Sequence, residues 1–216
     1  MTRSFDIKKW LAEHPEEEQF KHQFLDKNPF KVLFEVGIRA GHVVLDFGCG
    51  SGTYTIPAAN LVGGEGRVYA LDINSSFLDR MKERAKQEGL ENIVRIDASK
   101  EGEIPLENET IDVILLIDVL HLIENKEALF DEAYRILKGG GSIIVYPIHV
   151  AEEEVEEIAI SRSLNFEDRK FQNRFLIFRK FVKLHSSAKA SQKSEMVEVK
   201  KTVNNIGCEM SSTCGR

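Results

Sequence analysis

The fold is decided by VVLDFGCGSGTYTIPA, residues Val43–Ala58. This stretch passes from an apolar run into a loop with glycine at every second position, and then directly into a segment of helical composition. Glycine permits positive φ and lets a ligand lie against the backbone, because it has no Cβ. We therefore expect a strand, a tight loop and a helix, with a nucleotide or nucleoside seated at the carboxyl end of that strand.

The residues after this stretch repeat the alternation of short apolar runs with segments of helical period. Near-continuous apolarity is typical of parallel strands that are covered on both faces. Strands that alternate with helices in this way predict right-handed βαβ crossovers and a doubly wound sheet. We expect strands at residues 42–47, 67–71, 92–96, 111–117 and 142–146, and helices at 53–61, 75–88 and 126–138, the last ended by Gly139–Gly141.

The flanking segments have a different composition. Residues 1–40 are charged and amphipathic, and aromatic pairs four residues apart predict two short helices, broken at Asn28 and Pro29. Beyond the last predicted parallel strand, an acidic helix at 151–162 precedes two apolar runs at 166–172 and 174–181, which predict an antiparallel hairpin. We therefore divide the chain into an N-terminal helical cap (1–40), a ligand-binding domain (41–182) and a disordered tail (183–216).

Composition excludes several classes of protein. A chain of 216 residues with 42% hydrophobic and 30% charged residues is typical of one folded α/β domain, not of a fibrous, disordered or disulfide-stapled protein. The longest apolar run, residues 111–123, is too short to span a bilayer, which needs about 20 residues. The first residues lack the apolar core of a secretory signal, so we expect a cytoplasmic protein. A net charge of −6 makes nucleic acid an unlikely partner.

Three cysteines form a sparse, odd-numbered set that fits a reducing compartment: Cys49, Cys208 and Cys214. Cys208 and Cys214 have no further Cys or His at ligand spacing, which makes them a poor metal site. We therefore predict no metal site from the sequence.

The glycine spacing separates two classes of cofactor. The dinucleotide fingerprint G-x-G-x-x-G requires glycine five residues after its first glycine. Counted from Gly48 that position is Thr53, and counted from Gly50 it is Thr55, so the nicotinamide pattern fails in both registers. The sequence has D-x-G-x-G-x-G instead, from Asp46 to Gly52, and here it resembles the class I S-adenosylmethionine-dependent methyltransferases.

The resemblance covers about residues 30–182 and has specific implications. It implies a Rossmann-like fold: a doubly wound, mostly parallel seven-stranded sheet with helices on both faces and a C-terminal antiparallel hairpin. It also implies S-adenosylmethionine as cofactor and S-adenosylhomocysteine as product. The positions that it assigns to cofactor binding are Asp46, Gly48, Gly50, Gly52, Thr53, Asp72, Ile73, Asp97, Ala98 and Asp118.

Two acidic residues at predicted strand ends have alternative interpretations. Asp72 ends the second strand, where a carboxylate can accept hydrogen bonds from both ribose hydroxyls. A role as helix cap is less favoured, because Asn74 and Ser75 already supply caps. For Asp97 the resemblance implies an adenine contact, with the Ala98 N–H donating to the ring. Taken alone, Asp97 could equally begin a turn.

The catalytic candidates are Asp118 and His121, just past the fourth predicted strand. In the family this segment lies beneath the methionine portion of the cofactor and faces the acceptor. An imidazole titrates near neutrality, so His121 is the first candidate base if the acceptor must lose a proton, followed by Asp118, Tyr146 and His149. The alternatives are a turn-capping Asp118 and a His121 that only packs.

Methyl transfer from a sulfonium depends mostly on alignment, which can contribute about 7–11 kcal/mol, so few catalytic side chains are required. Short insertions favour a small-molecule acceptor. Within the family, the sequence most resembles the compact enzymes that methylate quinones, lipids and other small metabolites. Arsenite is disfavoured, because only Cys49 lies in the predicted folded body. Aromatic residues of the N-terminal block could cover an apolar acceptor or simply pack on the sheet: Trp10, Phe20, Phe24 and Phe30.

Two other classes of function remain as alternatives. One is a catalytically idle cofactor-binding or scaffold protein, which the intact loop, Asp72 and Asp97 argue against. The other is a nicotinamide-dependent oxidoreductase, which the glycine spacing argues against. The sequence does not fix the oligomeric state.

Overall fold

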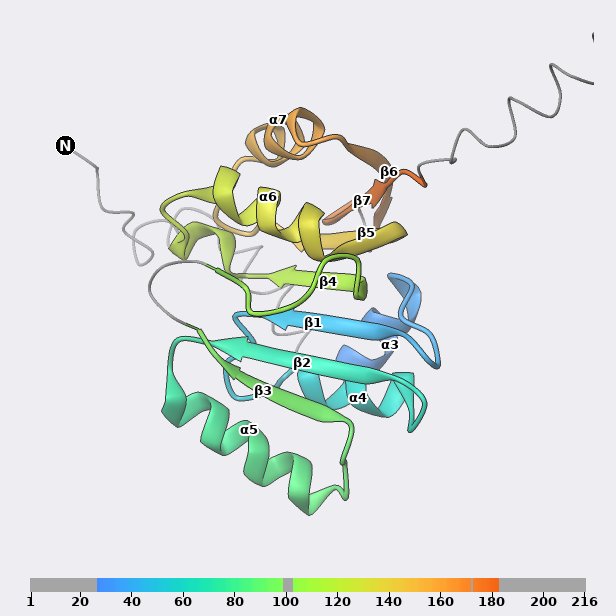
Figure 1. Ribbon diagram of the computed structural model, residues 1–216, viewed down its shortest axis with the longest axis vertical. Coiled ribbons are helices and arrows are strands. Elements are labelled where there is room, and N and C mark those ends of the chain that lie inside the picture. Colours follow the sequence, from blue (N-terminus) through green and yellow to red (C-terminus); the bar gives the residue numbers. More distant parts are fainter. Residues whose placement is uncertain (1–26, 99–102, 172, 183–216) are drawn as a thin grey trace, which may run out of the picture. The chain divides into compact units, whose positions relative to one another are not determined.

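The computed structural model describes residues 27–98, 103–171 and 173–182, which form a seven-stranded sheet in the order β3-β2-β1-β4-β5-β7-β6 (Figure 1). β1 to β5 are parallel, and β7 is antiparallel to both of its neighbours. The elements are α3 (Pro29–Glu35), β1 (Val43–Phe47), α4 (Thr55–Val62), β2 (Arg67–Asp72), α5 (Ser75–Gln87), β3 (Ile93–Asp97), β4 (Ile111–Ile117), the 3₁₀ turn η2 (Leu120–Leu122), α6 (Lys126–Ile136), β5 (Leu137–Tyr146), α7 (Glu152–Ser161), β6 (Leu164–Lys170) and β7 (Phe175–Lys180).

The predicted fold class is confirmed: a doubly wound, mostly parallel sheet that ends in an antiparallel hairpin. The hairpin begins earlier than predicted, at Leu164. A predicted helix near residues 20–24 and the predicted tail at 183–216 lie outside the described residues. Within the described ranges, no helix is long and apolar enough to cross a membrane.

Alternating side chains of the strands supply two apolar layers. On β1, Val44 packs with residues of α3 and α4, whereas its neighbour Leu45 packs with residues of α6 and α7. Both are fully buried, as strands between two helical layers require. Helices on both faces therefore hold the sheet rigid. The loops that follow the carboxyl ends of its strands are attached to fixed positions.

The break predicted at Asn28 and Pro29 is the start of α3. The Asn28 side chain accepts a hydrogen bond from the Lys31 N–H, and Pro29 occupies the first turn, where its missing N–H is not needed. The buried residues of this helix include Val32, whereas Phe30 is 49% exposed. Phe30 therefore does not pack its ring into the core.

The prediction that Gly139–Gly141 ends the third helix is wrong. α6 ends at Ile136, and the glycines lie inside β5, where the pairing with β4 shifts register. Gly140 has φ +83°, and a Cβ on Gly141 would lie 2.9 Å from the Asp112 carbonyl oxygen. These glycines therefore serve a β-bulge, in which the backbones of two strands approach closely.

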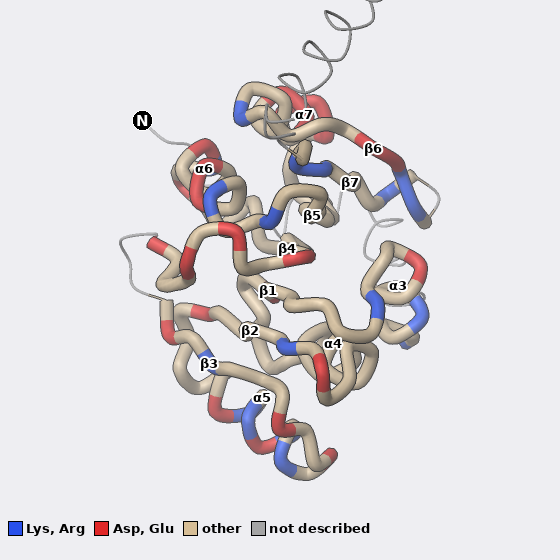
Figure 2. The backbone as a smooth tube through the Cα atoms, turned by 45° about the vertical axis from the view of Figure 1, so that its right-hand side comes forward, with Lys and Arg blue, Asp and Glu red and all other residues tan. Residues whose placement is uncertain are grey.

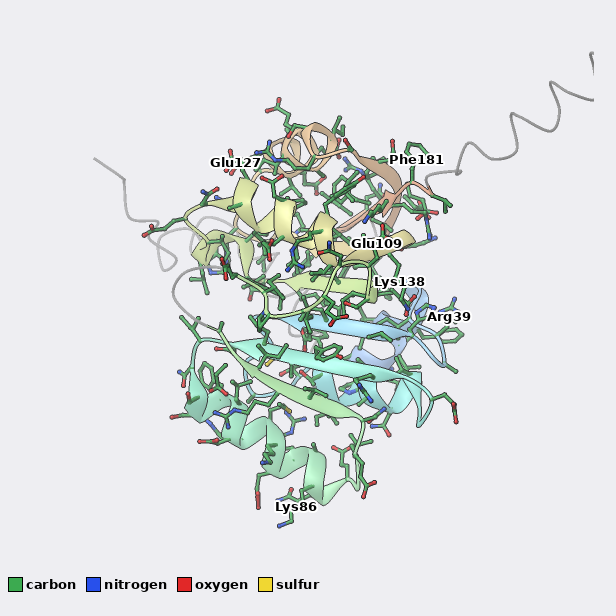
Figure 3. All side chains as sticks on the ribbon, in the orientation of Figure 1. Arg39, Lys86, Glu109, Glu127, Lys138 and Phe181 are labelled. Atoms are coloured by element: carbon green, nitrogen blue, oxygen red, sulfur yellow. The ribbon has the colours of Figure 1, made fainter. Side chains whose placement is uncertain are left out.

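Asp112 links the amino ends of three strands. Its Oδ2 accepts a hydrogen bond from the Val43 N–H at 2.8 Å, and its carboxylate pairs with the Lys138 ammonium at 2.8 Å. Figure 3 shows Lys138 beside the start of β5, with Arg39 near the start of β1. This charged edge is opposite to the carboxyl edge, where the sequence places the ligand.

Candidate functional site

The loop between β1 and α4 has the backbone that its glycines predict. Gly48, Gly50 and Gly52 have φ values of +74°, +54° and +87°. A Cβ on Gly48 would lie 2.5 Å from Cγ2 of Val119, and one on Gly52 would lie 2.6 Å from Cγ of Met81. Nothing lies within 4 Å of a Cβ on Gly50. The loop is thus packed on its inner side and open at its middle glycine, where a ligand can approach the backbone.

Asp46 lies beneath this loop with 3% of its surface exposed. The Thr55 hydroxyl donates to its Oδ2 at 2.6 Å. Burial raises the pKa of the Asp46 carboxyl to about 6, against the lowering effect of the Thr55 hydrogen bond, and the nearby Asp72 raises it further. Asp46 thus ties the end of β1 to the start of α4, and its contact with a cofactor stays a prediction.

Asp72 lies at the carboxyl end of β2 and contacts the glycine loop directly. Its Oδ2 accepts the Gly50 N–H at 2.8 Å, and its Oδ1 accepts the Asn74 N–H at 2.8 Å. Each carboxylate oxygen has a further acceptor position, so two hydroxyls of a ribose can still be bound. The cap of α5 is Asn74, whose side chain accepts the Ser76 N–H. This observation removes the helix-capping alternative for Asp72.

Asp97 ends β3 in a network that the sequence analysis missed. The Arg95 guanidinium donates to both Asp97 oxygens, with Nε–Oδ2 and Nη2–Oδ1 distances of 2.7 Å, and Ser75 donates to Oδ1 at 3.0 Å. Arg95, and then Ser75, hold the pKa of the Asp97 carboxyl below its usual range. The sequence contains the signal for the Arg95–Asp97 pair, because residues two apart on a strand point to the same face.

The Ala98 N–H differs from the expected role. It donates to the Asp72 carbonyl oxygen at 3.0 Å, as part of the connection between β2 and β3. An N–H that already has a backbone acceptor is not a ready donor for an adenine ring. The predicted adenine contact through this N–H therefore does not fit the structure. The adenine contact of the Asp97 side chain stays a prediction.

Two neighbouring features fit a flat, partly apolar ligand group at this edge. Ile73 follows Asp72 and is 77% exposed. A cavity of about 600 Å³ extends beside Asp97 and is lined also by Ile104 and Pro105. Arg135 also lines this cavity and holds Ile104 in place by donating a hydrogen bond to its carbonyl oxygen at 3.0 Å.

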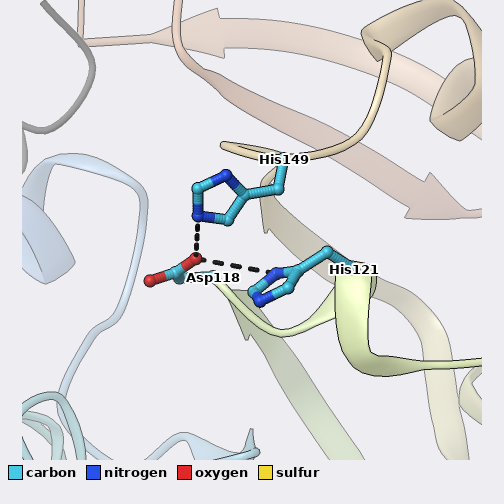
Figure 4. Close-up of side chains that lie close together, drawn as sticks. All are labelled: Asp118, His121 and His149. Carbon is cyan, nitrogen blue, oxygen red and sulfur yellow. Dashed lines mark ion pairs between the residues drawn. The ribbon is translucent and has the colours of Figure 1, made fainter. Parts of the chain in front are cut away.

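Asp118 and His121 are brought together, and His149 joins them (Figure 4). Asp118 follows β4 with φ +55°. Its Oδ1 lies 3.7 Å from Nδ1 of His121 and 3.4 Å from Nε2 of His149. The two imidazole rings meet edge to face, with centroids 4.5 Å apart. Sequence spacing alone does not predict the proximity of His149, because it depends on the pairing of β4 with β5.

Comparison with known proteins gives the family. Residues 38–205 match the sequence family described as "Methyltransferase domain". The chain belongs to this family. The match covers most of the sequence, including the glycine loop, Asp72, Asp97 and the cluster of Asp118, His121 and His149.

Named relatives of this methyltransferase domain agree with the family. A "Ubiquinone/menaquinone biosynthesis C-methyltransferase" of Marinomonas sp. is 32% identical over 123 residues, which are 57% of this chain and 49% of that protein. An "Arsenite methyltransferase" of Halobacterium salinarum is 30% identical over 105 residues, which are 49% of this chain and 27% of that protein. The chain thus spans about half the length of the first relative, and less of the second.

A solved structure extends the likeness to almost the whole fold. The "SAM dependent methyltransferase from Aquifex aeolicus" superposes with a TM-score of 0.65 at 25% identity, covering 82% of this chain and 100% of that one. The resemblance to class I S-adenosylmethionine-dependent methyltransferases is thereby confirmed, and with it S-adenosylmethionine as the cofactor of the family.

The residues at the carboxyl edge fit that cofactor. The open side of Gly50 gives a ligand access to the loop backbone, and the Asp72 carboxylate beside it has acceptor positions for hydroxyls. Carboxylates of Asp46, Asp72 and Asp118 lie at this edge, which suits a ligand that carries a positive sulfonium.

Proposed function

We propose that this methyltransferase domain transfers a methyl group from S-adenosylmethionine to a small-molecule acceptor by in-line displacement. The observation that carries the proposal is the hydrogen bond between the Gly50 N–H and the Asp72 carboxylate. It joins the glycine loop to the strand-end carboxylate in one rigid unit, as the binding of a nucleoside requires.

The chain's own residues have separate tasks in this proposal. The loop from Gly48 to Gly52 seats the cofactor against the backbone, and Asp72 holds the ribose hydroxyls. When bound, S-adenosylmethionine supplies a methyl group that is already activated on sulfur. His121 accepts a proton from the acceptor where one must be lost, and the neighbouring Asp118 carboxylate stabilises the imidazolium that forms.

Small organic acceptors are favoured over arsenite. Cys49 is the one cysteine among the residues that the structure describes, and within the glycine loop its side chain is buried against Leu78 and Met81. Burial, together with the charges of Asp46 and Asp72, raises the pKa of its thiol well above the usual range. A thiol of this kind does not supply the thiolate that arsenite binding requires. The name of the Marinomonas relative makes quinols the first acceptors to assay, because loss of a phenolic proton makes a carbon of their ring nucleophilic.

Calorimetric titration with S-adenosylmethionine, S-adenosylhomocysteine and NADH tests the cofactor. We expect the first two to bind and NADH not to bind. Asp72→Ala is expected to lose most of this affinity, because the ribose hydroxyls lose their acceptor. The matched control is Asp131→Ala, which removes an exposed carboxylate on α6. Affinity that is equal in both variants would contradict the role of Asp72.

Transfer itself is tested by incubating the chain with methyl-labelled S-adenosylmethionine and a panel of quinols, phenols and lipids. We expect the wild-type protein to transfer label to an acceptor, and His121→Ala to transfer it at least about a hundredfold more slowly. This result would support His121 as the general base. Unchanged turnover in His121→Ala removes it from the mechanism. Cofactor binding without transfer to any acceptor supports the scaffold alternative.

A further inference from the structure

Nitrogen and oxygen donors converge where β4 and β5 end. Asp118 follows β4, His121 lies in η2, and His149 lies in the turn after β5 (Figure 4). One ligand atom from each side chain lies within 4.8 Å of the others. The cluster therefore unites three potential metal ligands from segments that are separated by a helix and a strand.

One separation within the cluster equals the spacing of ligands around a small ion, and the other is slightly larger. Metal bonds of about 2.0–2.2 Å place neighbouring ligand atoms about 3.0–3.5 Å apart. Oδ1 of Asp118 lies 3.4 Å from Nε2 of His149 and 3.7 Å from Nδ1 of His121. Both distances exceed the roughly 3.2 Å limit of an ordinary N–H···O hydrogen bond. The three side chains thus form ion pairs around one point, and the same arrangement can place their ligand atoms around a common centre.

Burial and backbone structure hold the cluster in place. The side chains of His149, His121 and Asp118 are 3%, 9% and 19% exposed. The Asp118 N–H donates to the Tyr146 carbonyl oxygen at 3.3 Å, which links the end of β4 to the strand that leads into His149. The donors therefore need little rearrangement to bind an ion, whereas the partly exposed carboxylate leaves a side for entry.

We propose that Asp118, His121 and His149 bind one divalent transition-metal ion. Two imidazoles and one carboxylate are the donors of the facial triad, which leaves coordination positions open. The sequence predicted no metal site, because only the cysteines were weighed as ligands. With an ion bound, His121 is a ligand instead of the proton acceptor, and the open positions take an ionisable oxygen of the acceptor and favour its deprotonated form. This role rests on the proposed function, whereas binding of the ion does not.

Titration of the full chain with Co²⁺, followed by calorimetry and by visible absorption, tests the proposal. We expect one equivalent to bind with the absorption bands of nitrogen and oxygen ligands. His149→Gln and Asp118→Asn are expected to weaken this binding at least about 10–100-fold, the range that even loss of a supporting residue causes. The matched control is His42→Ala, which removes a histidine before β1 and should leave binding unchanged.

Circular dichroism identifies any variant that fails to fold, and His121→Gln then replaces it in the comparison. Equal Co²⁺ affinity in all folded variants would overturn the proposal, since the ion would be bound by other groups. Absence of bound Co²⁺ at millimolar concentration would also overturn it. Titration with S-adenosylmethionine in parallel separates the two proposals. Binding of the cofactor without binding of Co²⁺ refutes only the metal site, whereas binding of Co²⁺ without binding of the cofactor refutes only the proposed function.

Discussion

Individual residues at the carboxyl edge have two kinds of task, and the structure separates them. Asp46 and the inner glycines fix the loop, whereas Asp72 and the exposed Ile73 are the residues that we propose to contact the cofactor. The carboxyl edge therefore contains residues that stabilise the loop beside residues that we propose to bind the cofactor. Substitutions within it should have different effects on folding and on affinity.

Asp46 gives the stability a defined pH dependence. Its pKa is raised from 3.8 to about 6 in the folded protein, so the folded state holds the proton more tightly than the unfolded state. The free energy of unfolding then falls as pH rises through this window. Asp46→Asn cannot ionise, and it keeps an oxygen for the Thr55 hydroxyl.

We therefore expect the unfolding free energy of Asp46→Asn to rise relative to that of wild type as pH rises from about 3.8 to about 6. Above this window the gain reaches up to about 3 kcal/mol. Urea unfolding of both proteins at several pH values measures this difference. A difference that does not change with pH would contradict the prediction.

Gly48→Ala tests the packing of the loop. The new Cβ would lie 2.5 Å from Cγ2 of Val119, at a φ of +74° that L residues rarely adopt. We expect a loss of about 1–3 kcal/mol in unfolding free energy, with weaker cofactor binding. Gly64→Ala is the control, since nothing lies within 4 Å of its Cβ, and it should change stability by less than about 0.5 kcal/mol. Equal effects in the two variants would show that the Val119 contact does not matter.

Secondary-structure elements were predictable where their pattern is local. The periodicity gave α5 and α7 to within two residues at each end, and β4 without error. The glycines of β5 were misassigned, because a β-bulge depends on the partner strand and has no local signature. The meeting of Asp118 with His149 was missed for a related reason, because it depends on strand pairing. The Arg95–Asp97 pair was missed although its spacing of two residues predicts that both side chains lie on one face of the strand.

Asp112 supports the amino ends of the strands. Asp112→Ala leaves the Val43 N–H without its acceptor and Lys138 without its ion pair. We expect a loss of about 1–3 kcal/mol, because a partly buried donor loses its hydrogen bond. Asp112→Asn keeps an acceptor for Val43 and should lose less, about 0.5–1 kcal/mol, since exposed ion pairs contribute little. Denaturant unfolding measures both, and equal losses would show that the ion pair dominates.

The whole domain is a sheet covered on both faces, and its charges are mixed in sign. Figure 2 shows acidic and basic residues interspersed along α5 and acidic residues at the start of α7. A mixed surface of this kind fits a small-molecule acceptor better than a nucleic acid, which selects clustered basic residues. The strand order reverses between the parallel strands β1 and β4, and such a reversal is where sheets of this kind bind ligands, at the carboxyl ends of the strands.

Removal of residues 183–216 tests the predicted domain boundary. The apolar pattern ends near Val182, so we expect the shortened chain to fold and to bind S-adenosylmethionine with unchanged affinity. Circular dichroism and calorimetric titration of the two lengths measure this. The family match extends to residue 205, so a loss of binding would mean that residues beyond 182 contribute to the domain.

Val119 lies against Gly48 and directly follows Asp118. Its side chain therefore joins the glycine loop to the cluster of Asp118, His121 and His149, where we propose that the acceptor binds. A ligand that orders the loop must then change the affinity for the acceptor, and the coupling is reciprocal. The measurable consequence is that a saturating acceptor changes the dissociation constant of S-adenosylhomocysteine. An equal dissociation constant with and without the acceptor would show that this contact does not link the two sites.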